Sequence, residues 1–324
     1  MIIDKHGRPM NYLRVAVTDR CNLRCTYCMP HENMQFLPKN EILSYEELLR
    51  IITVFTELGV NKVRFTGGEP FFRKDFIDLL EYTSQLEGID SVNITTNGVL
   101  TQPYIDKLKK IKDLKLNISL DTLVAEKFIK ITRRNAFETV MKTINDAMEN
   151  GIQTKINMVV MDGVNTNEII DFVEYFRKTP VNLRFIEQMP FNEHENFKSV
   201  WTVDKISNLL SENYNVVQQP IQPQSTTIDY KIDSSDFVIG IIAGFSRSFC
   251  GTCNRIRLTS TGRIKTCLYA DPGLDVRALI RSGSNDAEIK ERLIEAIQQR
   301  HKNGFEAEEQ RSKQVFESMS KIGG

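Results

Sequence analysis

Residues 17–30 read Val-Thr-Asp-Arg-Cys-Asn-Leu-Arg-Cys-Thr-Tyr-Cys-Met-Pro and give Cys21, Cys25 and Cys28 the spacing C-x3-C-x2-C. Structural zinc sites usually supply four ligands in C-x2-C pairs. Three thiolates on a short loop can instead bind three irons of a cubane iron–sulfur cluster and leave the fourth iron open. An open iron indicates a site for chemistry rather than for structural support.

Two further features strengthen this interpretation: Tyr27 precedes the last cysteine, and Thr66-Gly-Gly-Glu-Pro70 follows later in the chain. Together with the triplet they resemble the radical S-adenosylmethionine (SAM) superfamily. The resemblance implies that SAM binds the open iron and that one electron from the cluster cleaves it to a 5'-deoxyadenosyl radical. The alternative is a zinc knot in which His31 is the fourth ligand.

The composition sets outer limits on the class of protein. The 324 residues suffice for one large α/β domain or two smaller ones. Lys+Arg and Asp+Glu both number 42, so no net charge attracts the chain to nucleic acid or to an anionic membrane. The longest apolar run, 237–245, is far shorter than the ~20 residues that span a bilayer. We expect a cytoplasmic protein with no nucleic-acid or membrane partner.

A second cysteine triplet lies near the other end of the chain, where Cys250-Gly-Thr-Cys253 is followed by Cys267. A chain of this length needs no disulfide framework, and three thiols in each triplet leave none to complete a four-cysteine zinc site. A zinc knuckle stays open as the alternative, because zinc is the commoner occupant of C-x2-C. The missing fourth ligand and the basic Arg255 and Arg257 favour a second iron–sulfur cluster.

Strand-like and helix-like stretches alternate between the two triplets. Ser44-x-x-Glu47 is a capping box that opens a helix ending at Leu58. Strands are expected at 13–17, 62–66, 91–95, 114–120, 155–160 and 182–186, with amphipathic stretches near 75–86, 103–110, 136–150 and 167–178. Six βα units without a return hairpin predict a parallel sheet, as in a doubly wound fold or an incomplete barrel.

The alternation is expected to stop after residue 186. The polar stretch 188–227, with one helical part at 203–214, is interpreted as a connection that leads to a strand-like segment at 229–242. Residues 255–267 alternate on both sides of Ser260-Thr-Gly262, which predicts a β-hairpin. This hairpin would bring Cys267 back beside Cys250 and Cys253.

The predicted strands are apolar on one face and polar on the other. Because successive side chains face opposite sides of a strand, the polar set converges on one surface. Near the carboxyl ends, where βα folds place their sites, Arg14, Arg64, Lys155 and Arg184 supply four positive charges. Such side chains suit the oxygens of a triphosphate, and no P-loop motif is present. Gly67-Gly68-Glu69-Pro70 is expected to let the backbone approach the amino group of SAM, with Glu69 fixing the geometry.

Motifs along most of the chain are similar to those of the GTP 3',8-cyclase family, which includes molybdenum cofactor biosynthesis protein A. They are Gly7-Arg-Pro, the first triplet, Phe36-Leu-Pro, Arg64-Phe-Thr-Gly-Gly-Glu-Pro70, Thr95-Thr-Asn-Gly98, Asn117-Ile-Ser-Leu-Asp121, Arg184-Phe-Ile-Glu-Gln-Met189-Pro, Phe249-Cys-Gly-Thr-Cys-Asn-Arg-Ile-Arg257 and Gly323-Gly324. The second triplet followed by Asn-Arg-x-Arg, together with the Gly-Gly end, is the most specific part of this resemblance.

The resemblance implies a role for each matching residue. Cys21, Cys25 and Cys28 would bind a 4Fe-4S cluster with SAM, and Tyr27, Gly68, Ser119 and Met189 would line the SAM site. Arg14, Arg64, Thr95, Lys155, Arg255 and Arg257 would contact GTP, and Cys250, Cys253 and Cys267 would hold a second 4Fe-4S cluster that meets the guanine. Further candidates for these sites are Gly67, Glu69, Asn157, Arg184, Ile256, Gly323 and Gly324. The Gly-Gly tail would reach into the active site.

The family fold is an incomplete (βα)6 TIM-like barrel, here residues 1–190, closed by a C-terminal region of residues 191–324 that carries the second cluster. The implied reaction starts when the 5'-deoxyadenosyl radical removes the ribose 3'-hydrogen of GTP. The sugar radical then attacks guanine C8, which gives 3',8-cyclo-7,8-dihydro-GTP. The implied partners are an external electron donor, a downstream cyclic pyranopterin monophosphate synthase and a second copy of the chain in a homodimer. No side chain is nominated as a conventional acid or base.

Two rival functions remain open on the sequence. One is a peptide-modifying radical SAM maturase with an auxiliary cluster, although such enzymes generally carry more C-terminal cysteines. The other is a zinc protein that binds nucleic acid without catalysis. The zero net charge and the lack of basic stretches with interspersed aromatic residues count against the second rival.

Overall fold

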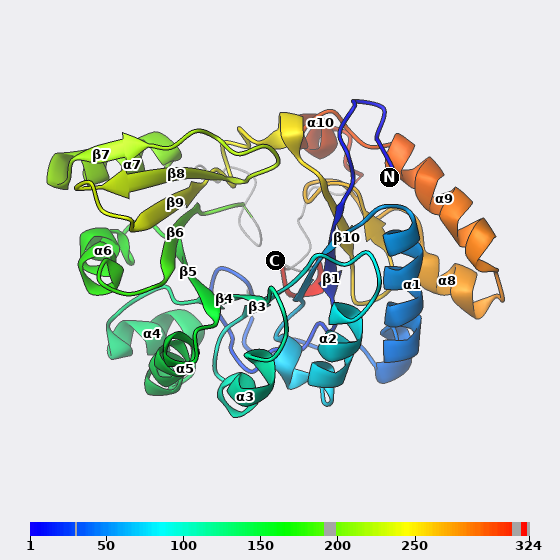
Figure 1. Ribbon diagram of the computed structural model, residues 1–324, viewed down its shortest axis with the longest axis horizontal. Coiled ribbons are helices and arrows are strands. Elements are labelled where there is room, and N and C mark those ends of the chain that lie inside the picture. The colour runs from blue at the N-terminus through cyan, green and yellow to red at the C-terminus, as the bar shows by residue number, and fades with distance from the viewer. Residues whose placement is uncertain (30, 191–198, 313–318, 323–324) are drawn as a thin grey trace.

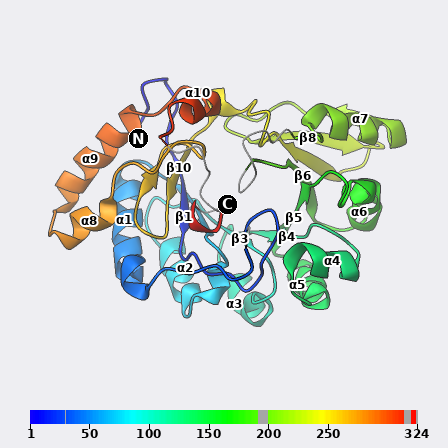
Figure 2. The ribbon, with the colours of Figure 1, turned by 180° about the vertical axis from the view of Figure 1, so that it is seen from behind.

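The computed structural model describes residues 1–29, 31–190, 199–312 and 319–322. Its strands form one sheet of eleven, in the order β11-β10-β1-β2-β3-β4-β5-β6-β9-β8-β7. The strands follow an arc, and the helices that connect them cover its outer side (Figures 1 and 2). The predicted α/β class with a mainly parallel sheet is confirmed.

The first six strands are parallel neighbours in chain order. They are β1 (Tyr12–Ala16), β2 (Lys62–Thr66), β3 (Ser91–Thr96), β4 (Lys115–Ser119), β5 (Gln153–Val160) and β6 (Asn182–Glu187). Each overlaps a strand expected from the alternating pattern. On the apolar face, Phe65, Ile94, Leu116, Ile156 and Phe185 are fully buried in the core. The polar face is thereby turned away from the helices.

The helices on the outer side begin and end largely where the sequence indicates. They are α1 (Tyr45–Glu57), α2 (Phe76–Ser84), α3 (Ile105–Leu108), α4 (Ala125–Thr132), α5 (Phe137–Glu149) and α6 (Ile169–Phe176). The capping box of α1 is confirmed, since Ser44 accepts from the Glu47 backbone and the Glu47 side chain accepts from the Ser44 backbone. Helix α4 was not expected; it buries Phe128 and Ile131 and ends at Arg133, whose φ is 56°.

The segment after β6 corrects the expectation that the alternation stops at residue 186. It contains α7 (Val203–Asn213), β7 (Val216–Gln218), β8 (Thr227–Ile232) and β9 (Val238–Ile242). Strand β9 lies parallel to β6, while β8 lies antiparallel to β9. The stretch 229–242 is thus two strands, because Asp233 and Ser234 adopt φ values of 50° and 56° and turn the chain. Asp is among the residues that tolerate this conformation best.

The predicted C-terminal hairpin is confirmed as β10 (Arg255–Leu258) and β11 (Ile264–Lys265). Strand β10 also lies parallel to β1, with Tyr12 opposite Arg255 and Arg14 opposite Arg257. The hairpin therefore extends the sheet beyond β1. The chain continues through α8 (Val276–Arg281), α9 (Asp286–Gln298), α10 (Gly304–Glu309) and α11 (Met319–Ile322). None of the helices in the described part of the chain is long and apolar enough to cross a membrane.

Candidate active site

A cavity of about 600 Å³ lies on the polar face of the sheet and is lined by all six cysteines. It is also lined by most of the predicted ligand-binding residues: Arg14, Tyr27, Arg64, Gly67, Gly68, Thr95, Ser119, Lys155, Asn157, Arg184, Met189, Arg255 and Arg257. The fold thus brings together residues that are spread over more than two hundred positions of the chain. Gly323 and Gly324, which were also candidates, lie outside the described residues.

The two triplets stand at opposite ends of the neighbouring parallel strands β1 and β10. The first triplet follows the carboxyl end of β1, whereas Cys253 precedes the amino end of β10. Cys267 follows β11, which runs antiparallel to β10, so the hairpin returns it towards Cys253 as expected. The inner face of the two strands lies between the triplets.

All six cysteines are free thiols of intermediate exposure. Among the described residues, no three side chains of His, Cys, Asp or Glu converge closely enough to hold a single metal ion. A zinc site would need its ligands around one ion. The three thiolates that bind a cubane lie farther apart, because each binds a different iron.

The first triplet has uncharged and acidic neighbours and one nearby cation, Arg24, whose Nη1 donates to the Cys21 carbonyl oxygen. Cys21 Sγ accepts from the Leu23 backbone at 3.4 Å and from Asn97 Nδ2 at 3.5 Å. Burial and the charge of Glu69 raise the pKa of Cys21 to about 11. Burial and the charge of Asp121 likewise raise the pKa of Cys25. Arg24 acts to lower the pKa of Cys21, but burial and Glu69 outweigh it.

Tyr27 is anchored by Asp121, a residue to which the sequence assigned no role. Its hydroxyl donates to Asp121 Oδ2 at 2.9 Å, while Asp121 Oδ1 accepts from the Val159 backbone at 2.9 Å. Burial raises the pKa of Asp121 to about 6, although both hydrogen bonds oppose that rise. The carboxylate thus lies beside the first triplet and fixes the orientation of the Tyr27 ring.

The two glycines after β2 bring backbone segments together. A Cβ on Gly67 would lie 2.4 Å from the Thr18 carbonyl oxygen, and one on Gly68 would lie 2.1 Å from that of Arg20. The glycines thus let the loop after β2 pack directly against the cysteine loop. Whether Gly68 also approaches SAM stays a prediction.

Glu69 lies behind the cavity wall and is fully buried. Its carboxylate accepts from the Phe71 and Asn97 backbones and from Thr96 Oγ1 at 2.7 to 3.1 Å. Burial raises the pKa of Glu69 to about 7. These bonds tie the loop after β2 to the loop after β3 and stabilise the wall of the cavity.

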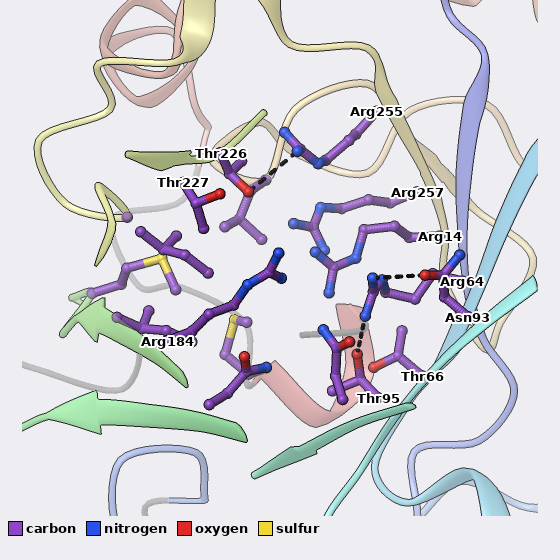
Figure 3. Close-up of a pocket in the computed structure, with 18 of the residues that line it drawn as sticks. Arg14, Arg64, Thr66, Asn93, Thr95, Arg184, Thr226, Thr227, Arg255 and Arg257 are labelled. Carbon is purple, nitrogen blue, oxygen red and sulfur yellow. Dashed lines mark hydrogen bonds between the residues drawn. The ribbon is translucent and has the colours of Figure 1, made fainter. Parts of the chain in front are cut away.

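Five arginines converge in the middle of the cavity (Figure 3). Arg14, Arg64, Arg255 and Arg257 come from neighbouring strands, and Arg184 points across the cavity towards them. Arg14, Arg64, Lys155 and Arg184 lie in the inner part of their strands rather than at the carboxyl ends as expected. Their position suits a ligand that lies along the sheet between the two triplets.

The positively charged side chains of this basic cluster repel one another strongly. Burial and the charge of Arg64 lower the pKa of Arg184 to about 10, and burial and Arg255 lower that of Arg257 to about 10. Burial and the charge of Arg184 lower the pKa of Lys155 to about 7. A polyanion bound here would relieve both the repulsion and the loss of hydration.

Two residues that lie beside the basic cluster, Tyr12 and Lys62, were not predicted from the sequence. Arg64 donates to Thr95 Oγ1 at 3.1 Å, to Asn93 Oδ1 at 3.2 Å and, through Nε, to the Tyr12 hydroxyl. Burial acts to raise the pKa of Tyr12, but the surrounding cations outweigh it and lower that pKa to about 7. Lys62 Nζ lies 4.7 Å from the centre of the Tyr12 ring. Tyr12 and Lys62 lie two positions before Arg14 and Arg64 on the same strands, so the strand alternation that identified those arginines could have identified them too.

The second triplet has a cationic environment. Arg300 Nη2 lies 3.0 Å from Cys253 Sγ, and Arg255 Nη1 lies 3.8 Å from the same sulfur. Burial acts to raise the pKa of Cys253, but these two arginines lower it to about 7. Burial raises the pKa of Cys250. Arg300 was not predicted, and Ile256, which was, lies in the apolar core and does not line the cavity.

A turn in the weakly matching region of the sequence also contributes to the cavity. Residues 223–227 line it, and Arg255 Nη2 donates to the Gln224 carbonyl at 3.2 Å and to Thr226 Oγ1 at 3.3 Å (Figure 3). Asn254 Nδ2 donates to Gln224 Oε1 at 3.0 Å. The segment between β7 and β8 is therefore part of the site and not only a connection.

Comparisons with known proteins agree with this geometry. The chain matches the family models "Radical SAM superfamily" over residues 15–176 and "Molybdenum Cofactor Synthesis C" over residues 181–306. It is 40% identical to a GTP 3',8-cyclase of Syntrophomonas wolfei over the whole of both chains. It is 39% identical to the mitochondrial GTP 3',8-cyclase of Arabidopsis thaliana, over the whole of this chain and 84% of the relative.

Solved structures show the same fold at low sequence identity. Streptococcus suis SuiB matches with a TM-score of 0.62 and 18% identity over 93% of this chain and 72% of SuiB. A SAM-bound structure of SuiB matches with a TM-score of 0.58 over 87% of this chain and 68% of that protein. Likeness at such identity establishes the fold alone, whereas identity near 40% over the full length establishes the family. The chain therefore belongs to the GTP 3',8-cyclase family of the radical SAM superfamily.

Proposed function

We propose that this protein converts GTP to (8S)-3',8-cyclo-7,8-dihydroguanosine 5'-triphosphate in molybdenum cofactor biosynthesis, with two 4Fe-4S clusters and SAM as cofactors. The observation that carries the proposal is a single cavity with a cysteine triplet towards each end and buried cations between them. The names of the two relatives described above support the same assignment.

The donor set at each end fits a cubane with one open iron. Each triplet supplies three free thiols that line the cavity, and a fourth cysteine is missing from both. Cys21, Cys25 and Cys28 would hold the cluster that binds SAM, and Cys250, Cys253 and Cys267 would hold the cluster that faces the guanine. When bound, the first cluster with SAM would supply a 5'-deoxyadenosyl radical for the reaction at the ribose 3'-hydrogen.

Tyr27, Gly68, Ser119 and Met189 would line the SAM site at the carboxyl end of the strands. Tyr27 is held by the Asp121 carboxylate, so its ring forms a fixed side of this site. Asp121 and Glu69 supply the acidic surroundings described above, and such surroundings favour a cationic sulfonium and ammonium. The site residues thereby position SAM without taking part in bond breaking.

Arg14, Arg64, Thr95, Lys155, Arg255 and Arg257 would bind GTP, with Arg184 as a further contact. Guanidinium groups bind phosphate oxygens through paired, charge-assisted hydrogen bonds. Within the described part of the chain, Asn117 Oδ1 and Asn157 Oδ1 are buried without a hydrogen-bond partner, and both residues line the cavity. They are suitable acceptors for hydroxyl groups of the ribose.

Binding GTP along the sheet would fix one C–H bond within reach of a reactive primary radical. Such positioning replaces a random encounter and excludes competing hydrogen donors, including water and oxygen. The side chains then mainly bind and orient, and the cofactors carry the difficult chemistry. No acid or base among the described residues needs to drive the reaction.

The finer architecture and the partners belong to the same proposal. The arc of β1 to β6 would be an incomplete (βα)6 TIM-like barrel within residues 1–190, closed by residues 191–324 with the second cluster. The protein would act as a homodimer in the cytoplasm, where reducing conditions keep the six thiols free. An external electron donor would reduce the clusters, and a cyclic pyranopterin monophosphate synthase would take the product.

The test is anaerobic purification followed by iron and sulfide analysis and a SAM cleavage assay. We expect about eight irons per chain, as two cubane clusters require, and 5'-deoxyadenosine formation that depends on GTP and a reductant. Bound zinc without SAM cleavage would contradict the proposal. SAM cleavage that depends on a peptide instead of GTP would show that the protein is a peptide-modifying radical SAM enzyme.

A further inference from the structure

Arg300 places a positive charge directly against the second triplet. It follows the end of α9 and is almost fully buried. Its Nη2 donates to Cys253 Sγ at 3.0 Å, and its Nη1 contacts Met10 Sδ. A guanidinium has five N–H donors and stays protonated, so this contact is a charge-assisted N–H to sulfur hydrogen bond.

The orientation of Arg300 is set by a tight turn at the N-terminus. Ile3 and Pro9 form an antiparallel bridge that closes the turn and presents Asp4 and Arg8. The Asp4 carboxylate has no solvent-exposed side-chain surface and lies 3.9 Å from Arg300 Nε. The same carboxylate accepts from Arg8 Nε at 2.7 Å. Asp4 thus connects the two arginines.

Arg8 links this turn to the backbone of the second triplet and to the backbone that follows Arg300. It donates to the carbonyl oxygens of Cys250 at 3.0 Å, His301 at 2.8 Å and Lys302 at 2.7 Å. The partners lie more than two hundred positions away in the chain. Arg300 is therefore fixed towards Cys253 by a buried network rather than by chance contact of a flexible side chain.

The described contacts of Cys21 in the first triplet are weaker than this one. Cys21 in the first triplet accepts from an amide side chain and a backbone N–H, both neutral and longer than 3.3 Å. The reduction potential of an iron–sulfur cluster depends on hydrogen bonds to its sulfurs and on nearby charge. A cationic donor favours the more negative, reduced state.

We propose that Arg300 is a positioning residue for the second triplet, which fixes the Cys253 thiolate and raises the reduction potential of an iron–sulfur cluster bound there. This inference rests on the proposed function, because it requires that cluster. Arg300 touches neither substrate nor reacting atoms in this account. Its effect is to make the second cluster easier to reduce than the same cluster would be without the guanidinium.

The experiment isolates the second cluster by replacing Cys21, Cys25 and Cys28 with Ala. In this background we would compare Arg300→Gln, which removes the charge, with Arg300→Lys, which keeps it. The matched control is Arg292→Gln, on the preceding helix α9, whose side chain is 56% exposed. An anaerobic redox titration followed by electron paramagnetic resonance gives the midpoint potential of each variant, and iron analysis gives its cluster content.

We expect a lower midpoint potential in Arg300→Gln, a smaller decrease in Arg300→Lys and no change in Arg292→Gln. Cluster loss in Arg300→Gln with retention in Arg300→Lys would also support the role of the charge. Equal potentials in all variants, or cluster loss in both Arg300 variants, would overturn it in favour of a packing role. A parent variant that binds no iron and sulfide at all would instead contradict the proposed function.

Discussion

The two cysteine triplets line the same cavity but differ in their electrostatic surroundings. At the first, burial and the carboxylates of Glu69 and Asp121 raise the pKa values of Cys21 and Cys25. At the second, Arg300 and Arg255 overcome burial and lower the pKa of Cys253 to about 7. Negative charge is thus disfavoured at Cys21 and Cys25 but favoured at Cys253. In the proposed function, this difference would separate a place for the cationic cofactor from a place for the polyanionic substrate.

The largest expected effect comes from removing one triplet at a time. Cys25→Ala should reduce SAM cleavage to the level of a protein-free control, because the first cluster supplies the electron. Cys253→Ala should abolish cyclisation but retain some reductive SAM cleavage at an intact first cluster. Quantifying 5'-deoxyadenosine and the cyclised nucleotide separates these outcomes. Equal losses of SAM cleavage in both variants, each with full iron at its intact triplet, would show that the two triplets do not have separate roles.

Removing one cation from the basic cluster should weaken only the substrate end. Arg257→Ala loses a charge-assisted contact worth ~1.5–3 kcal/mol, so the Kd for GTP should rise roughly 10- to 150-fold. Titration of GTP into the anaerobic protein measures this change. Arg263→Ala is the control, since that side chain belongs to the same hairpin region and is 44% exposed. Weaker SAM binding in Arg257→Ala, with GTP binding unchanged, would be the opposite of our expectation.

The affinity for GTP should fall as the pH rises through about 7. In the free protein Lys155 has its pKa lowered to about 7 and is charged only below it. Tyr12 has its pKa lowered to about 7 and becomes negative above it. Both changes weaken anion binding, each by at most ~10-fold per pH unit, as expected for one proton.

GTP binding should be measured from about pH 6 to about pH 9, a range that lies between the ordinary pKa values of His and Lys and includes both titrations. Lys155→Arg should flatten the curve because arginine stays protonated, and Tyr12→Phe should remove the part due to the phenol. Affinity that increases with pH, or a curve unaffected by both substitutions, would show that these groups do not face the ligand.

A smaller effect is expected from Asp121→Asn at the other end. Asn keeps one acceptor oxygen for the two donors, the Tyr27 hydroxyl and the Val159 backbone, so one hydrogen bond is lost with the charge, at a cost of ~0.5–1.5 kcal/mol. The Kd for SAM should rise roughly 2- to 12-fold, and GTP binding should not change. Asp106→Asn, with a side chain that is 85% exposed, serves as the control. A selective loss of GTP affinity would reverse the assignment of the two ends.

The sequence predicted the local parts of the fold well, because their signals lie within a few residues. Strand alternation and the capping box at Ser44 and Glu47 are examples. The pairing of β9 with β6 was missed, since parallel pairing joins segments that are distant in the chain. Helix α4 was missed because only a single-residue turn at Arg133 and a short loop separate it from α5.

The site shows the same limit. The cysteines and the strand cations were found from spacing and parity, but Arg300 stands 47 positions from Cys253 in a stretch without a motif. Asp4 and Arg8 join that network from the opposite end of the chain. Ile256 was among the further candidates, and strand alternation turns its side chain into the core. Contacts made only by tertiary packing leave no periodic signal.

The most direct test of the divided cavity is transfer of hydrogen between its two ligands. Incubation with SAM, a reductant and GTP deuterated at the ribose 3' carbon should place deuterium in 5'-deoxyadenosine, as mass spectrometry detects. This result requires the radical from one end to reach the ribose of a nucleotide held at the other. Unlabelled 5'-deoxyadenosine formed alongside consumed GTP would contradict the account.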